Sequence, residues 1–476
     1  MKTLIYFYQY LVFFYGIAFI VVISILLLLS MFKAWSYKWK YTKKEDEILK
    51  KSPYAPGISI IAPAYNEEKT IITNVRSLLT IDYPNFEVVI VNDGSTDKTL
   101  DLLIDEFQLV ETPYVYVEKV QCKPFKGLYK STNSEYSSLT VVSKVNGGTK
   151  ADASNAGVNV AKHNYFVCTD VDCILSRNAL LKMIEPVLNS SVQVIAVGIT
   201  MRMVNSCEIN EDGVITRVRP PRGIIPRFQE LEYLRSYLVS KMGWSAMGLM
   251  PNVSGGIGLF DKSVVIAAGG YDSLSHAEDM DMLIRMIAYM KNFNKPYKIP
   301  HVPVTGCWTE GPPNLFVLNK QRTRWGRGLL QFFIVHRKLL FNRHYGKEGL
   351  VMLPYLFIFE LLAPIVEFSG IAMTIYFLFT NKVNFETAYV LLLFVSLFFI
   401  MVSAITVVYD MVINKLYRKY REYVVLFLCS LIELLIYHPF IIFFNVKGYV
   451  DFLFKQKFEW GEMKRQGVQV KQNEEI

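Results

Sequence analysis

The chain has 476 residues, of which 52% are hydrophobic, and a formal net charge of +9. This length is enough for roughly two to four domains, and the positive mean hydropathy argues against a protein that is soluble throughout. The net charge does not require nucleic acid as a partner, because lysines and arginines beside the apolar runs supply much of it and membrane lipids with anionic headgroups explain them. The six cysteines show no C-x-x-C spacing and no histidine set completes a zinc site, so we interpret them as reduced thiols of a cytosolic domain.

The first apolar run covers residues 11–32, which carry no charge and are long enough to span a bilayer. A cleaved signal peptide is the alternative, but the run is too long and no small-residue cleavage site follows it. The next segment is rich in lysine, so the positive-inside rule places it in the cytoplasm and the N-terminus outside. We predict a transmembrane helix in residues 1–34 and a basic juxtamembrane linker in residues 35–55.

Strand and helix patterns then alternate along the chain. Helical spacing is found in residues 69–81, 100–106 and 150–162. Apolar strand patterns cover residues 58–63, 86–91, 115–120 and 139–144, and a further strand is expected in residues 165–173, with Asp170 and Asp172 at its exposed end. Such alternation predicts a mostly parallel sheet covered on both faces, that is, a Rossmann-like α/β domain, to which we assign residues 56–315.

Polar side chains follow four of the predicted strands where each strand ends. They are Tyr65 and Glu67, then Asp93, then Lys144, and finally Asp170 and Asp172. Ligands of parallel sheets bind beyond the carboxyl ends of the strands. These residues are therefore expected to line one binding site.

Asp170 and Asp172 are separated by one residue, so alternation along a strand would point both to the same side. Two close carboxylates repel unless a cation lies between them, and Mg²⁺ or Mn²⁺ bridging the phosphates of a nucleotide meets that need. An isolated D-x-D also fits a solvated strand end. The motifs around it favour the metal site.

Taken together, the ordered motifs resemble the family 2 glycosyltransferases of the GT-A fold. The motifs are A-Y-N-E, V-N-D-G-S-T-D, K-x-x-G-x-x-x-A-x-x-x-N-x-G, T-D-V-D, S-G-G, E-D and Q-R-T-R-W. The last is a Q-x-x-R-W motif, typical of membrane synthases of cellulose, chitin, hyaluronan and poly-N-acetylglucosamine. The resemblance covers residues 55–345 and implies a GT-A domain inserted between transmembrane helices.

The resemblance implies how a UDP-sugar donor would be held. Asp93 would hydrogen-bond the uracil or ribose, Tyr65 and Glu67 would lie beside the base, and Lys144 would contact the nucleotide. For Lys144 a solvated lysine at a strand end is the alternative. Asp172 would bind the metal that bridges the diphosphate, with Asp170 on the ribose or sugar side, and the cation would offset charge on the leaving group.

Glu278 and Asp279 open a predicted helix that continues to residue 288. Acidic residues at a helix N-terminus are favourable through the helix dipole alone. The resemblance instead makes Asp279 the general base that an inverting transferase needs to take the proton of the acceptor hydroxyl, with Glu278 beside it. Gly255 lies in a turn whose glycines would let the backbone approach the acceptor sugar, although a tight turn also explains them.

The Q-x-x-R-W motif begins an amphipathic stretch, which we place in an interface segment of residues 316–346 that lies on a membrane surface. This position alone accounts for basic residues. The resemblance adds that Arg324 would pair with the diphosphate. Trp325 would stack on the acceptor sugar, and Gln321 would lie on the acceptor side.

Three further apolar runs, at residues 350–379, 388–408 and 424–444, predict membrane helices in residues 347–446. Glu360 and Glu367 are seven residues apart, and either line a polymer path or make a contact between helices. His438 and Pro439 interrupt the last run. We expect this run to be re-entrant or to lie on the surface, which keeps the basic tail of residues 447–476 inside.

The leading hypothesis is therefore a multi-pass enzyme of the cell membrane with a cytoplasmic catalytic domain. It would use a UDP-sugar and Mg²⁺ or Mn²⁺ to elongate a β-linked polysaccharide processively and export it. Three or four spans make a small channel, so a homo-oligomer or an export partner is expected. Two alternatives remain, a single transfer onto a lipid acceptor and an inactive sugar- or nucleotide-binding subunit.

Overall fold

A computed structural model describes residues 2–40, 43–381 and 383–454 of the chain. The chain forms two compact units. Within the described residues, the sheet unit comprises Tyr37–Arg222 and Asn252–Gly311, and the helical unit comprises the chain up to Ser36, Gly223–Pro251 and the chain from Pro312 to Phe454. Residues 466–476, which the sequence predicts to be disordered, lie outside the described ranges.

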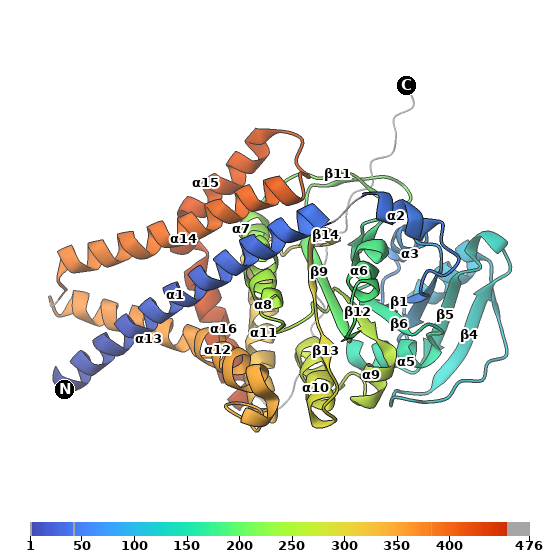
Figure 1. The fold of residues 1–476 in the computed structure, drawn as a ribbon, viewed down its shortest axis with the longest axis horizontal. Coiled ribbons are helices and arrows are strands. Elements are labelled where there is room, and N and C mark those ends of the chain that lie inside the picture. The colour runs from blue at the N-terminus through green and yellow to red at the C-terminus, as the bar shows by residue number, and fades with distance from the viewer. Residues whose placement is uncertain (1, 41–42, 382, 455–476) are drawn as a thin grey trace. The chain divides into compact units, whose positions relative to one another are not determined.

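The sheet unit is built on a mixed sheet of ten strands in the order β3-β4-β5-β2-β1-β6-β12-β9-β14-β7 (Figure 1). Its centre is parallel: β1 (Ile58–Ala64) pairs with β2 (Phe86–Asn92) and with β6 (Tyr165–Thr169), and β2 pairs with β5 (Leu139–Lys144). This confirms the mostly parallel core. The flanking β4 (Phe125–Ser131) and β12 (Ile257–Asp261) run antiparallel to β5 and β6, which the alternation of strands and helices did not indicate.

The remaining elements of the sheet unit surround this centre. They are α2 (Lys43–Lys50), α3 (Ile71–Leu79), α4 (Thr99–Phe107), β3 (Leu109–Glu111), α5 (Lys150–Val160), β7 (Ile174–Leu175), α6 (Ala179–Leu188), β8 (Gln193–Val194), β9 (Ala196–Met203), β10 (Glu208–Ile209), β11 (Ile215–Arg217), α9 (Lys262–Ala267), α10 (Glu278–Asn292), β13 (Tyr297–Lys298) and β14 (His301–Thr309).

Residues 115–120 form no strand in the described chain, so that prediction is wrong. Val115 and Val117 are exposed, with Val115 fully open to solvent, and of the three valines only Val120 is buried, so a strand here would bury little apolar surface. Tyr116, which lies between the two exposed valines, stacks instead on Phe125 of β4, with the ring centroids 4.1 Å apart. The valine alternation in this segment reflects aromatic packing rather than a sheet face.

Helix α5 packs on the centre of the sheet through small residues. A Cβ on Gly157 would lie 2.3 Å from Ile61 Cγ2, so only glycine permits this approach to β1. Asn155 holds the chain at Tyr271, donating to its carbonyl at 2.9 Å and accepting from its N–H at 2.8 Å. The A-x-x-x-N-x-G part of the motif is thus structural and fixes the start of α5 beside the strand ends.

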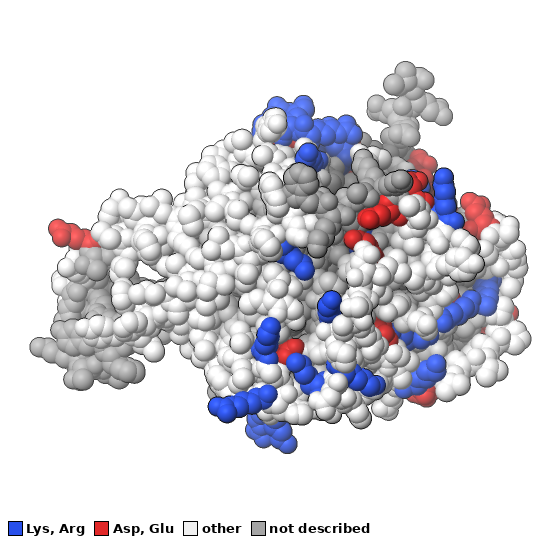
Figure 2. Space-filling view, in the orientation of Figure 1, with Lys and Arg blue, Asp and Glu red and all other residues white. Residues whose placement is uncertain are grey.

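Among the residues that the structure describes, three helices are long and apolar enough to cross a membrane, Tyr10–Tyr37, Glu348–Phe379 and Ala388–Ile413. Tyr409 Oη donates to the Ser30 carbonyl at 2.9 Å and so joins the last of these to the first. Figure 2 shows that the described surface along the middle of these helices carries almost no charged side chains. The predicted apolar segments at both ends of the chain are confirmed as helices of membrane-spanning length.

The helices of the helical unit follow in chain order. They are α1 (Lys2–Lys40), α7 (Ile224–Leu234), the π-helical turn Arg235–Lys241, α8 (Met242–Ala246), α11 (Leu315–Val335), the π-helical turn Glu348–Met352, α12 (Leu353–Leu356), the π-helical turn Phe357–Leu361, α13 (Ala363–Phe379), α14 (Phe385–Ile413), α15 (Tyr420–Ile436) and α16 (His438–Phe454).

The predicted interruption at His438 is present as a bend of 51° between α15 and α16. Pro439 is the second residue of α16, a position where its missing N–H costs no helical hydrogen bond. The bend fits a broken span or a re-entrant loop. The side of the membrane on which the tail lies stays a prediction.

One boundary differs from the predicted domain of residues 56–315. Gly223–Pro251 groups with the helical unit because α7 and α8 pack there, and a Cβ on Gly243 of α8 would lie 2.6 Å from the Leu26 carbonyl oxygen of α1. The sheet unit is therefore made of two chain segments.

Candidate active site

The loops that follow β1 and β2 hold each other in place. Asn66 adopts a positive φ of 54°, and its N–H donates to Ser95 Oγ at 3.1 Å. The Thr96 N–H donates to Asn66 Oδ1 at 2.9 Å, and the Glu67 N–H to Thr99 Oγ1 at 2.9 Å. This network presents Tyr65, which is 46% exposed, at the end of β1 beside Glu67. Both residues follow the carboxyl end of β1, and their place beside a nucleotide base stays a prediction.

Asp93 and Lys144 form a buried ion pair at the ends of β2 and β5. Lys144 has no exposed surface, and its Nζ also contacts Asp152 Oδ1 at 2.6 Å and donates to the Val145 carbonyl at 2.7 Å. The Gly147 N–H donates to Asp93 Oδ1 at 3.0 Å. The lysine thus orients Asp93, and neither the solvated lysine nor a direct contact with a nucleotide corresponds to this geometry.

Asp170 and Asp172 lie in a tight turn and not on the strand itself. Strand β6 ends at Thr169, and the Cys173 N–H donates to the Asp170 carbonyl at 3.0 Å. This turn, rather than alternation along a strand, brings the side chains together: one ligand atom from each of Asp170, Asp172 and Cys173 lies within 4.8 Å of the others. Carboxylate oxygens at this spacing, with the Asp170 side chain 38% exposed, fit Mg²⁺ or Mn²⁺.

Lys150, the first residue of α5, was not predicted to belong to the site. Its Nζ lies 2.5 Å from Asp170 Oδ1 and donates to the Gly255 carbonyl at 2.6 Å. Burial alone would lower the pKa of Lys150, but the negative charges of Asp170 and Glu278 outweigh it and raise the pKa above its usual value. Lys150 therefore stays cationic. Its only signal in the sequence is its place at the start of a helix that follows a strand end.

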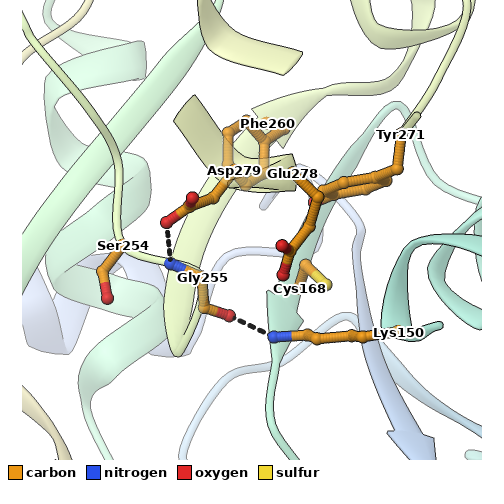
Figure 3. A pocket seen from close by; sticks show the side chains of 8 residues that line it. All are labelled: Lys150, Cys168, Ser254, Gly255, Phe260, Tyr271, Glu278 and Asp279. Carbon is orange, nitrogen blue, oxygen red and sulfur yellow. Dashed lines mark hydrogen bonds between the residues drawn. The ribbon is translucent and has the colours of Figure 1, made fainter. Parts of the chain in front are cut away.

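Asp279 lies at the N-terminus of α10, where its Oδ2 accepts from the Gly255 N–H at 2.9 Å and its Oδ1 from the Met280 N–H at 2.8 Å. Gly255 thus connects Asp279 to Lys150, as Figure 3 shows. A Cβ at Gly255 would lie 3.4 Å from Asp279 Oδ2. The turn predicted to approach the acceptor sugar holds the two charged groups in register.

A small pocket surrounds this connection (Figure 3). The Glu278 carboxylate, the Ser254 side chain and the Tyr271 ring line it together with the residues named above. Burial raises the pKa of Tyr271, and it also raises that of Cys168. The phenol and the thiol are therefore neutral at ordinary pH, and the proton-accepting groups of the pocket are its carboxylates.

The three predicted residues of the Q-x-x-R-W motif share helix α11 in the helical unit. Gln321 accepts from Gln229 Nε2 at 2.9 Å, Arg324 is half-buried and Trp325 is 37% exposed. The structure therefore brings together Asp93 with Lys144, Asp170 with Asp172, and Asp279 with Gly255. Gln321, Arg324 and Trp325 all belong to the helical unit, whereas the other predicted site residues belong to the sheet unit.

A model of the glycosyl transferase family group 2 matches residues 166–404, which is more than half of the chain. The chain belongs to the family 2 glycosyltransferases. A second model, glycosyl transferase family 2, matches residues 59–121, which contain the loops after β1 and β2. The resemblance drawn from the sequence motifs is thus confirmed.

This family 2 glycosyltransferase is similar to enzymes described as poly-beta-1,6-N-acetyl-D-glucosamine synthases. It is 26% identical over 275 residues to the one from Staphylococcus epidermidis, and 27% identical over 277 residues to the one from Staphylococcus aureus strain COL. Each match covers 57% of this chain and 54% of the relative. The match spans about half the length of these curated relatives.

Among solved structures, the chain is similar to a mannosyltransferase from Pyrobaculum calidifontis, described in complex with GDP-Man and Mn²⁺. The TM-score is 0.50 with 17% identity, over 91% of this chain and 99% of that one. At this identity the likeness shows the fold. The predicted GT-A fold with helices of membrane-spanning length is confirmed.

Proposed function

We propose that the chain is a membrane glycosyltransferase that transfers sugar from a UDP-sugar to a growing β-linked polysaccharide. The observation that carries this proposal is the connection of two carboxylate groups through Lys150 and Gly255. Asp170 and Asp172 lie on one side of it and Asp279 on the other. The descriptions of the staphylococcal relatives make UDP-N-acetylglucosamine the first donor to test.

On the donor side, Asp93 binds the uracil or ribose, with Tyr65 and Glu67 beside the base. Lys144 and the Gly147 N–H fix the Asp93 carboxylate, so that it needs no rearrangement when the nucleotide arrives. A lysine without exposed surface does this without touching the ligand.

Asp172 and Asp170 would hold Mg²⁺ or Mn²⁺, with Asp172 as the metal ligand on the diphosphate side and Asp170 on the ribose or sugar side. When bound, such a cation neutralises charge on the departing UDP. Lys150 lies against Asp170 and adds positive charge to the same side of the pocket. The positive lysine and the oxygen ligands suit a site for an anionic leaving group.

Asp279 acts as the general base of an inverting transfer. Two backbone N–H groups orient it, since those of Gly255 and Met280 each donate to a different oxygen of the carboxylate. Its carboxylate takes the proton from the attacking hydroxyl as the anomeric carbon is approached. Glu278, the preceding residue, lines the same pocket and adds negative charge near Lys150.

The resemblance assigns the residues of the Q-x-x-R-W motif to the acceptor and the diphosphate. Trp325 stacks on the terminal sugar, Gln321 lies on the same side, and Arg324 pairs with the diphosphate through its two parallel donors. The enzyme lies in the cell membrane with the sheet unit in the cytoplasm. It exports its product through its own helices, as a homo-oligomer or with a partner.

The deciding experiment gives the purified full-length chain radiolabelled UDP-N-acetylglucosamine, and then other UDP-sugars, with and without Mn²⁺ or Mg²⁺. Polymer formed only with metal supports the proposal. Metal-independent activity contradicts the assignment of Asp170 and Asp172. A single sugar on lipid identifies the lipid-acceptor transferase, and absence of turnover with every donor points to a binding subunit.

A further inference from the structure

The second residue of the Q-R-T-R-W sequence, Arg322, is buried and forms a bidentate ion pair with a partly buried glutamate. Its side chain is 4% exposed, and its Nη1 and Nη2 donate to the two carboxylate oxygens of Glu232 on α7 at 2.6 and 2.5 Å. Two parallel charge-assisted hydrogen bonds of this kind fix the plane of a guanidinium group. A lysine at this position would offer a single ammonium group, which does not fix the orientation of the side chain in this way.

Tyr437 closes the pair from a third element. Its hydroxyl donates to Glu232 Oε2 at 3.0 Å and accepts from Arg322 Nη2 at 3.2 Å. The ring is buried and lies 5.3 Å from that of Phe228 on α7. Because Tyr437 directly precedes α16, the bend between α15 and α16 delivers this hydroxyl to the ion pair.

The fixed guanidinium in turn contacts Trp325. The Arg322 Cζ lies 4.4 Å from the centroid of the indole ring, one helical turn further along α11. A cation over a tryptophan face is attracted by the negative charge of the ring's π face. Arg322 thus contacts the Trp325 ring, while Trp325 keeps 37% of its surface exposed.

The backbones that carry these side chains are closely packed. A Cβ on Gly326 of α11 would lie 2.8 Å from the Asn445 carbonyl oxygen, and one on Gly448 of α16 would lie 2.5 Å from the Thr323 carbonyl oxygen. The two helices therefore touch through their main chains next to Trp325. A side chain anchored here has little freedom to follow helix motion.

We propose that Glu232, Arg322 and Tyr437 are positioning residues that hold the Trp325 indole in one orientation for stacking on the acceptor. The inference rests on the proposed function, which makes Trp325 the acceptor-stacking residue. An indole that is fixed before binding does not lose rotamer freedom when the sugar arrives. The loss for one immobilised side chain is about 0.5–1.5 kcal/mol, which corresponds to about a 2- to 10-fold change in affinity.

The geometry is tested without reference to activity by ¹⁹F NMR of the full-length chain labelled with 5-fluorotryptophan. Trp325→Phe assigns the resonance. Glu232→Gln and Tyr437→Phe should each shift or broaden it while leaving the resonance of buried Trp244 unchanged. Tyr437→Phe removes one hydroxyl only and keeps the test valid if Glu232→Gln does not fold. A Trp325 resonance unchanged in both variants overturns the inference.

The matched control is Glu230→Gln, which changes a buried glutamate two residues away on α7. Glu230 accepts from Tyr417 Oη at 3.1 Å and not from Arg322 in the contacts of the described chain. The Trp325 resonance should be the same in this variant as in the parent protein. A shift as large as that of Glu232→Gln would show that any lost charge on α7 disturbs the indole, which overturns the specific role of Glu232.

Kinetics with a β-1,6-linked N-acetylglucosamine trisaccharide as acceptor test the consequence. Glu232→Gln and Tyr437→Phe should raise the KM for acceptor about 2- to 10-fold and leave the KM for UDP-N-acetylglucosamine unchanged. In a double-mutant cycle with Trp325→Ala, the second change should add nothing. Additive effects, or an unchanged acceptor KM in both positioning variants, overturn the inference alone. An unchanged acceptor KM in Trp325→Ala overturns the stacking role and the inference with it.

Discussion

At the scale of single residues, Gly255 decides how the candidate site is arranged. Its N–H orients Asp279 and its carbonyl receives Lys150, which contacts Asp170. A backbone group is insensitive to rotamer changes, so the separation of the two charged sides depends on one turn. Gly255 thereby fixes the positions of the Asp279 carboxylate and the Lys150 ammonium group relative to each other.

The role of Asp279 is tested by Asp279→Asn. This change keeps the shape and the hydrogen-bonded position but removes the proton acceptor, so transfer should fall about 100-fold or more while UDP still binds. Transfer rates and UDP titrations measure the two effects separately. Asp101→Asn, which changes an exposed acid in the first turn of α4, is the control and should transfer at the parental rate. Near-normal transfer by Asp279→Asn would place the base elsewhere.

At the scale of elements, two contacts each hold a pair of helices together. The first is the main-chain packing of α11 on α16 at Gly326 and Gly448. The second lies in the sheet unit, where Lys182 of α6 binds Asp46 of α2 at 2.6 Å next to Glu185. Each has a measurable signature.

Gly448→Ala should separate α11 from α16, because the new methyl group would lie 2.5 Å from the Thr323 carbonyl oxygen. Overpacking of this kind destabilises by about 1–3 kcal/mol. We expect a lower melting temperature in detergent together with reduced transfer. Gly16→Ala in α1 is the matched control, since a Cβ there meets nothing within 4 Å. Equal melting temperatures for the Gly448→Ala variant and the parent would contradict the packing argument.

The contact of α2 with α6 should depend on pH. Burial, with Glu45 and Asp46 nearby, raises the pKa of Glu185 from 4.5 to about 7, and Lys182 opposes this only in part. Folding therefore favours the protonated form. The contribution is complete below pH 4.5 and is lost as the pH rises through about 7.

The measurement is the melting temperature of the full-length chain between pH 5 and pH 8, compared with that of Glu185→Gln. The parent should lose stability toward pH 8 by a margin that the glutamine variant lacks. Glu135→Gln, at an exposed position, is the control and should follow the parent. Identical pH profiles for the parent and for Glu185→Gln would show that Glu185 does not titrate in this range.

At the scale of the whole molecule, the number of membrane crossings depends on the bent pair α15–α16. The positive-inside rule predicts that the loop at residues 414–419 and the tail after residue 454 both face the cytoplasm, because both are basic. Reporter fusions at Lys415 and at Ile476 should therefore give the same cytoplasmic signal. An outside signal at Ile476 alone would show that the pair is one broken span.

Sequence patterns predict those parts of the fold that depend only on neighbouring residues in the chain. The central strands are buried on both faces and read as apolar runs, so β1, β2, β5 and β6 follow from the sequence. Strand β4 does not, because Phe125–Ser131 mixes apolar and charged residues at the side of the sheet. Lys150 and the buried state of Lys144 depend on contacts with residues distant in the chain, such as Gly255 and Asp93. No spacing in the sequence records those contacts.

The turn at Gly255 also limits how the two sides of the pocket can move. The peptide group before its Cα is tied to Asp279 and the one after it to Lys150. The φ and ψ angles of this one residue therefore set the relative orientation of both ties. Under the proposed function, the group that accepts the proton and the lysine beside the leaving nucleotide are both attached to the backbone of Gly255. A change in the conformation of this residue would therefore move both groups.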